Sequence, residues 1–130
     1  MLVRMPRFTL LEHTGAPDDP VGRHFDLLLE DGVACRTWRL MEIPQAGGSA
    51  VAALELPPHR LAWLDIRESA ISGGRGRARR MDAGEYEVVS IQPGALDKVQ
   101  LDALGHDRWE LVAIRAGDGL DQMVFKRERR

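Results

Sequence analysis

The residues best suited to chemistry in this chain are two histidines and an aspartate: His13, His24 and Asp26. Residues 23–31, RHFDLLLED, alternate as a strand does, and residues i and i+2 of a strand project from the same face. His24 and Asp26 are therefore predicted to project together. His13 ends the preceding predicted strand, residues 7–13, and reaches the same place if the two strands are antiparallel neighbours.

This set of side chains predicts a divalent-metal site. Two imidazoles and one carboxylate suit manganese, zinc or ferrous iron, and they leave coordination positions open for water and a substrate. The same spacing has a plainer interpretation, in which the histidines are surface residues at the rim of a barrel, because the His-x-Asp pattern is common. The residues alone leave both interpretations open.

A third histidine lies further along the chain, next to an arginine. His59 precedes Arg60 and follows two prolines. It is predicted to serve as a fourth ligand or a general acid, or else to be a half-exposed loop residue. His106 follows a glycine and is predicted to be a loop residue.

Almost all basic residues are arginines, whose planar fork matches phosphate groups. Residues 75–80 read RGRARR. If residues 74–81 form a strand, Arg75, Arg77 and Arg79 share one face and are predicted to bind a nucleic-acid backbone. The alternative is an edge strand that carries charge to prevent aggregation.

A hydrophobic period of two dominates the chain, and turn residues separate the alternating segments. One helix is predicted, over residues 95–104, and residues 51–56 are an apolar run that Pro57-Pro58 should stop. The sequence therefore predicts an all-β fold: residues 1–130 as a single domain, a small β-barrel of about seven or eight mostly antiparallel strands with one short helix. The predicted strands are 7–13, 23–31, 33–43, 59–66, 74–82, 85–91, 108–116 and 121–128.

The composition is typical of one soluble domain. The chain has 130 residues, of which 44% are hydrophobic and 29% charged. The net charge of −2 neither favours nor excludes a nucleic-acid partner. The single cysteine, Cys35, excludes an internal disulfide and is predicted to pack as a small core residue. Because the sequence has no apolar run of membrane length and no secretory signal, a cytoplasmic protein without a membrane partner is expected.

Residues 7–44 resemble the 3′-phosphoesterase domain of bacterial DNA ligase D. That family has a strand ending in His, a loop, an HxDxRLE strand, a Gly-Val hairpin, a strand ending in SW and a proline loop. This chain has RFTLLEH, RHFDLLLE, DGV, TW and Pro44 in the same order. Later segments also resemble the family's KRLA, GxGxVxxWDxGxY and WxLV stretches: HRLA (59–62), GRGRARRMDAGEY (74–86) and WELV (109–112).

The resemblance implies a small β-barrel that binds manganese, and the ligand types also allow zinc as the next candidate. The family removes 3′-phosphates and 3′-ribonucleotides from nucleic-acid ends in DNA end repair. His13, His24 and Asp26 match its metal ligands, Arg60 matches an arginine that supports phosphate chemistry, and Glu30 matches a strand glutamate. The implied partners are 3′ ends of DNA or DNA–RNA, together with a ligase or polymerase acting in trans.

The chain also departs from the family pattern. The family arginine two residues after the metal-binding aspartate is Leu28, the lysine of the proline loop is Gln45, and residues 65–69 lack the family's further His and Tyr. These losses predict weak activity, with Arg60 or Arg67 as substitutes and a gain in turnover on restoring arginine at position 28. They also favour an alternative: a non-catalytic metal- and nucleic-acid-binding module derived from the same family.

Overall fold

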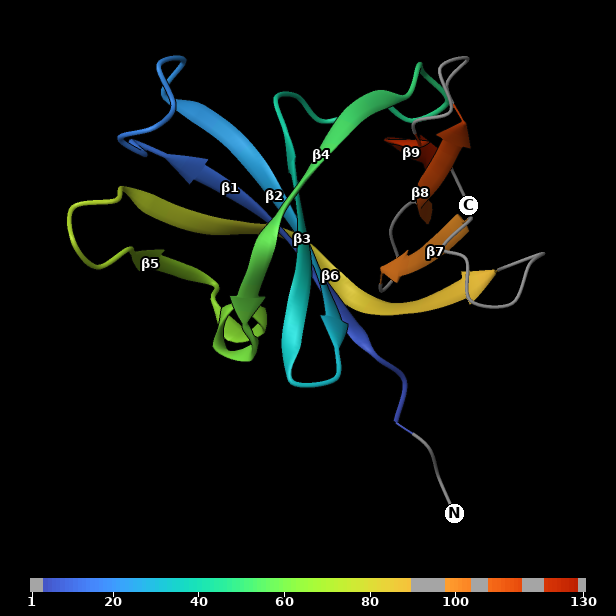
Figure 1. The fold of residues 1–130 in the computed structure, drawn as a ribbon, viewed down its shortest axis with the longest axis horizontal. Coiled ribbons are helices and arrows are strands. Elements are labelled where there is room, and N and C mark those ends of the chain that lie inside the picture. Colours follow the sequence, from blue (N-terminus) through green and yellow to red (C-terminus); the bar gives the residue numbers. More distant parts are fainter. Residues whose placement is uncertain (1–3, 90–97, 104–107, 116–120, 129–130) are drawn as a thin grey trace.

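The computed structural model describes residues 4–89, 98–103, 108–115 and 121–128 (Figure 1). Within these ranges the chain forms nine strands and one short 3-10 helix. In chain order the elements are β1 (Arg7–Thr14), β2 (Arg23–Asp31), β3 (Ala34–Leu40), β4 (Val51–Arg60), η1 (Leu61–Asp65), β5 (Glu68–Ala70), β6 (Arg77–Val89), β7 (Lys98–Ala103), β8 (Arg108–Arg115) and β9 (Asp121–Glu128).

The strands form a single antiparallel sheet in the order β1-β2-β3-β4-β9-β8-β7-β6-β5, and β6 also pairs with β1. The predicted all-β class is confirmed. The sheet is not closed into a regular barrel, because β4 and β9 pair only through Val51, Ala52 and Ala53. Beyond Ala53, β4 pairs with β3 alone and runs away from β9 toward η1 (Figure 1).

Strand β2 is buried on both faces, and this determines where the candidate site lies. Phe25, Leu27 and Leu29 join the main core, which draws residues from β1, β2, β3, β4, β6 and β8. Leu28 faces the other way, into a second apolar cluster with Leu11, which η1 covers through Leu64. The even-numbered face of β2 is therefore shielded from solvent although it lies outside the main core.

The predicted helix over 95–104 is wrong where the structure describes it. Lys98–Ala103 form strand β7, hydrogen-bonded to β6 on one side and to β8 on the other. Residues 95–97 and 104 lie outside the described part of the chain. The apolar spacing in this segment is compatible with both periods. Two strand partners satisfy its backbone groups more completely than a short helix, whose terminal groups lack partners, would do.

Two predicted boundaries around the prolines are also corrected. Strand β4 continues through Pro57-Pro58 to Arg60, and residues 61–65 of the predicted strand 59–66 form η1 instead. The prolines are tolerated because β4 has no β9 partner there and its register against β3 shifts between Cys35 and Thr37.

The predicted strands 74–82 and 85–91 are joined, because Arg77–Val89 form one strand, β6, without a break between them. Residues 74–76 precede this strand and are not part of it. A register shift opposite Leu10 and Leu11 lets β6 bend without breaking, so that its first part pairs with β1 and its last part with β7. Strand β5 is too short to carry a periodic signal and was not predicted.

Candidate metal centre

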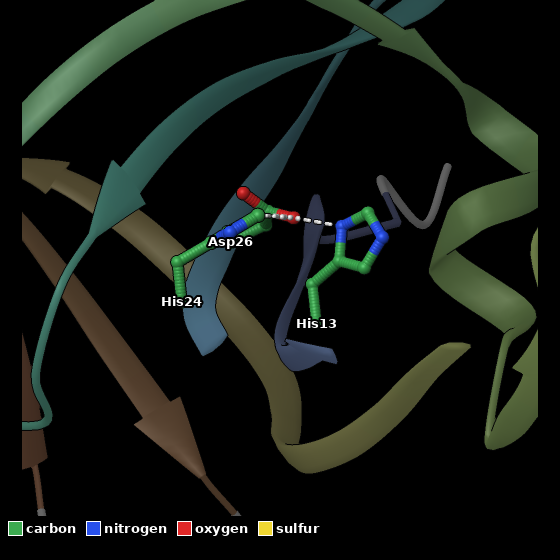
Figure 2. Close-up of side chains that lie close together, drawn as sticks. All are labelled: His13, His24 and Asp26. Carbon is green, nitrogen blue, oxygen red and sulfur yellow. Dashed lines mark ion pairs between the residues drawn. The ribbon is translucent and has the colours of Figure 1, made fainter. Parts of the chain in front are cut away.

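His13 and His24 are directly opposed residues of the antiparallel pair β1–β2, and Leu11 is opposed to Asp26. The side chains of His13, His24 and Asp26 converge on the face of the sheet formed by the even-numbered residues of β2 (Figure 2). The exposed fractions of His13, His24 and Asp26 are 8%, 0% and 2%. One ligand atom from each residue lies within 4.8 Å of the others, so the predicted convergence is confirmed.

The outer nitrogen of each imidazole has a fixed hydrogen-bond acceptor. His13 Nε2 donates to the backbone carbonyl of Arg75 at 2.7 Å, and a carbonyl can only accept. His24 Nδ1 donates to the buried carboxylate of Asp19 at 2.9 Å. These two partners assign the proton of each neutral ring to its outer nitrogen, so that the lone pairs are on His13 Nδ1 and His24 Nε2.

Both of these lone-pair nitrogens face Asp26. His13 Nδ1 and His24 Nε2 each lie 3.4 Å from Asp26 Oδ2. Within the described residues, His24 Nε2 and Asp26 Oδ1 are buried and have no hydrogen-bond partner. Three electron-pair donors that converge in a largely buried position favour a cation between them, either a proton or a metal ion. The cluster can therefore hold a metal ion.

The pKa directions show the same demand for a cation. Burial alone would raise the pKa of Asp26, but the hydrogen bonds that form when His13 and His24 are protonated outweigh it and lower the pKa to about 2. The same bond from the protonated ring to Asp26 raises the pKa of His13. Burial lowers the pKa of His24, but the bonds of its protonated ring to Asp26 and Asp19 raise it overall. The carboxylate is thus ionised, and a proton competes with a metal for the histidines.

Gly76 places the carbonyl that orients His13. Its φ of +89° is a backbone conformation that residues other than glycine rarely adopt. A Cβ at this position would collide with the carbonyl oxygen of Thr14 and with the backbone of Gly15. The turn that precedes β6 can therefore approach the end of β1 only with glycine here, and this approach brings the Arg75 carbonyl to His13.

A cavity of about 510 Å³ adjoins the cluster. His13, Asp26 and Arg39 line one side of it, and Leu56 and Trp63 line it from β4 and η1. His24, the third member of the cluster, is fully buried and is not among the cavity-lining residues. A metal held by the three ligands would thus be reached from this cavity, which combines a charged side with an apolar wall.

Arg39 is a cavity residue that the sequence analysis did not identify. It is the β3 residue directly opposed to Asp26, and it lines the same cavity. One of its terminal nitrogens, Nη1, lies 3.3 Å from the carboxylate of Asp18. Its Nε is buried and makes no hydrogen bond to any residue that the structure describes. Only the register between β2 and β3 reveals this placement.

The structure brings His59 into the cavity but not into the cluster. His59 is half-buried and lines the cavity, with its Nδ1 donating to the Pro57 carbonyl at 3.2 Å and its ring packed edge-on against Trp63. Arg60 is exposed at the end of β4 and is not among the cavity-lining side chains. Arg67 is likewise exposed and outside the cavity lining.

The arginine strip is only partly a strand. Because β6 begins at Arg77, Arg75 lies in the preceding turn, where its guanidinium donates to the carbonyl and hydroxyl of Ser72. Arg77 and Arg79 share the predicted face, and each has an acidic neighbour: Glu68 at 3.5 Å and Glu12 at 3.3 Å. All three arginines are exposed, and their binding of nucleic acid stays a prediction.

Comparison with protein-family models and with curated proteins gave no match to this chain. Among the described residues no helix is long and apolar enough to cross a membrane. Cys35 is fully buried, and burial raises the pKa of its thiol to about 11, which fits the predicted role as a packed residue rather than a nucleophile.

Proposed function

We propose that this chain is a metal-dependent phosphoesterase that acts on 3′ ends of nucleic acid in DNA end repair, with manganese as the preferred ion and zinc as the next candidate. One observation carries the proposal. Two imidazole lone pairs and an ionised carboxylate converge beside a cavity of about 510 Å³ that Arg39 also lines. A cation site next to an arginine suits a phosphate ester, whose charge both can neutralise.

The ligand set fits such an ion. His13, His24 and Asp26 would hold it, and three protein ligands leave positions for water and a phosphate oxygen. When bound, the ion supplies Lewis-acid polarisation of the phosphate and lowers the pKa of a water. The Arg75 carbonyl and the Asp19 carboxylate keep the two rings in the ligating tautomer throughout.

His59 is the proposed proton carrier. Its Nδ1 donates to a backbone carbonyl, so the lone pair of the neutral ring is on Nε2. That nitrogen can take a proton from an oxygen of a substrate in the cavity and, once it is protonated, give the proton to a leaving oxygen. The apolar wall formed by Leu56 and Trp63 suits the sugar and base of a terminal nucleotide, which supports a nucleic-acid end over inorganic phosphate as the substrate.

The resemblance to the ligase D domain supplies the 3′ polarity, and with it a DNA or DNA–RNA end as the substrate. A ligase or polymerase that acts in trans would use the 3′-hydroxyl that such a reaction leaves. Arg77 and Arg79, which lie outside the cavity lining, would contact the backbone away from the end, and Arg75, which lines the cavity, would contact it near the end.

The test is turnover of matched oligonucleotides that carry either a 3′- or a 5′-phosphate, with manganese, with zinc or with a chelator. Manganese-dependent release from the 3′-phosphate is expected, and Asp26→Asn should reduce it to background. Asp65→Asn is the matched control, because Asp65 is an exposed carboxylate paired with Arg7. Equal turnover in chelator, or equal turnover by Asp26→Asn, would contradict the proposal.

A second candidate function follows from the same metal centre. Leu28 and the absence of His and Tyr from residues 65–69 favour a non-catalytic module that binds metal and nucleic acid. This alternative predicts manganese binding to the wild-type protein and retention of labelled 3′ ends, without release of phosphate. The same set of oligonucleotides therefore separates the two functions.

A further inference from the structure

Arg39 lines the cavity beside the metal ligands, and its buried Nε makes no hydrogen bond to any residue that the structure describes. We propose that Arg39 binds the phosphate of the substrate, and that Asp18 holds its guanidinium until the phosphate takes the place of the Asp18 carboxylate. This inference rests on the proposed function, because it assigns the group that recognises phosphate at the same site.

The sheet register places Arg39 next to the metal ligands. Asp26 and Arg39 are directly opposed on β2 and β3, and directly opposed side chains lie on one face of the sheet. Both line the cavity, as does His13. The side chain of Arg39 is 22% exposed, so its stem is held by its surroundings while its end reaches the cavity.

Position 28 could not supply this group. Leu28 is fully buried in the second apolar cluster, and its β3 partner is Thr37, not a cavity residue. An arginine at position 28 would enter an apolar environment. The guanidinium that the resemblance predicts two residues after Asp26 is thus supplied from the neighbouring strand.

The contact that Arg39 makes with Asp18 is weak and easily replaced. The Asp18 side chain is 68% exposed and accepts one bond, from Arg39 Nη1 at 3.3 Å. Exposed ion pairs of this kind contribute little to stability. A phosphate can instead accept two parallel hydrogen bonds from one guanidinium, which are stronger. Exchange of carboxylate for phosphate therefore favours the bound substrate.

Arg75 is the other arginine in the cavity lining, and it is less suited to the task. Its guanidinium already donates to the carbonyl oxygen of Ser72 at 2.7 Å and to the Ser72 hydroxyl at 3.2 Å. It lies on an exposed turn rather than on a strand. Arg39, by contrast, stands on a strand that is hydrogen-bonded on both sides at this point, to β2 and to β4.

The experiment measures binding of inorganic phosphate and of manganese, each by titration calorimetry, with and without the other. Arg39→Ala should weaken phosphate binding by about 10- to 100-fold, the loss typical of charge-assisted hydrogen bonds. Its manganese affinity should not fall, because loss of a nearby positive charge favours a bound cation. Arg39→Lys keeps the charge and the stem but lacks the fork, so it should restore only part of the phosphate affinity. Asp18→Asn should tighten phosphate binding.

Arg36→Ala is the matched control, since it removes the same charge from the same strand. Arg36 pairs with Glu55 and packs over Trp38, away from the cavity lining. Its phosphate affinity should equal that of the wild type, and circular dichroism spectra of all variants show whether they are folded.

The outcomes separate this inference from the proposed function. Normal manganese binding with phosphate affinity unchanged in Arg39→Ala would overturn the role of Arg39 and leave the metal centre standing. Arg39-dependent phosphate binding in a protein that does not bind manganese would support the role of Arg39 and overturn the metal-dependent function. Failure to bind either would overturn both.

Discussion

His13 and His24 face each other across β1 and β2 as a directly opposed pair, with ring centroids 4.8 Å apart and ring planes tilted by 58°. Each ring donates from its outer nitrogen, one to a backbone carbonyl and the other to a carboxylate. The two rings therefore differ in the atom that they offer inward: Nδ1 from His13 and Nε2 from His24. Because the two rings are in different tautomers, both can point a lone pair at one carboxylate oxygen. The same tautomer in both rings would turn a proton rather than a lone pair inward from one of them.

The first prediction concerns Asp19, which orients His24. Asp19→Ala removes the acceptor of His24 Nδ1 and should lower manganese affinity by about 10- to 100-fold, as loss of outer partners of metal-binding histidines commonly does. The measurement is a manganese titration followed by electron paramagnetic resonance. Asp65→Ala, which removes an exposed carboxylate outside the cavity lining, is the control and should keep the wild-type affinity. Equal affinities for the two variants would show that Asp19 does not orient the ring.

The second prediction is the pH dependence of stability. The pKa values of His13 and His24 are raised above 6.5, so their contribution to metal-free stability is present below pH 6.5 and is lost as the pH rises through the raised values. The pKa of Asp26 is lowered from 3.8 to about 2, so its contribution is lost only in strong acid. The Tm of the metal-free protein should therefore fall between pH 6 and pH 8.

Manganese should reverse this trend, because only neutral histidines ligate and because binding to the folded state stabilises it. The rise in Tm on adding manganese should be larger at pH 8 than at pH 6. The matched variant is His13→Gln, which should show a smaller fall in metal-free Tm and a smaller rise with metal. A rise in Tm that is larger at pH 6 would contradict ligation by the histidines.

The third prediction concerns Gly76. Gly76→Ala forces a Cβ against the Thr14 carbonyl and should destabilise the protein by more than the about 1–2 kcal/mol that a left-handed backbone costs a side chain. It should also weaken metal binding, because the Arg75 carbonyl moves away from His13. Gly74→Ala is the control: its φ is +68°, but no atom lies within 4 Å of the added Cβ. Urea unfolding gives the free energy of unfolding of both variants. Equal losses of stability would contradict the close approach of Gly76 to Thr14.

The fourth prediction corrects the expectation that arginine at position 28 would restore activity. Leu28→Arg buries a charge in the cluster with Leu11 and Leu64, and it should cost about 3–5 kcal/mol of stability without raising turnover. Leu28→Met conserves volume and polarity and should cost less than about 1.5 kcal/mol. A stable Leu28→Arg variant with faster phosphate release would contradict this placement.

Part of this site could be predicted from the sequence. Strict alternation places His24 and Asp26 on one face whatever the rest of the fold does, and the short chain between the strands makes β1 the natural neighbour that carries His13. The all-β class follows from the same alternation, which repeats along most of the chain.

The remainder depends on contacts between residues far apart in sequence. Arg39 meets Asp26 only because β2 and β3 pair in one register, and a slip of one residue would send it to the other face. Gly76 is one of several glycines in an Arg-Gly stretch, and only its distance to Thr14 distinguishes it. Strand β7 was mistaken for a helix because its partners β6 and β8, not its own spacing, decide its conformation.

The narrow seam between β4 and β9 has a consequence for how an ion enters. Amide hydrogen exchange should be fastest where that three-residue pairing opens, yet β1 and β2 are each hydrogen-bonded to strands on both sides. Opening of the seam should therefore leave the spacing of the opposed histidines unchanged. The donor atoms would then be arranged before an ion binds, and the rate of metal uptake should depend on diffusion through the cavity and on loss of the competing proton rather than on refolding of the sheet.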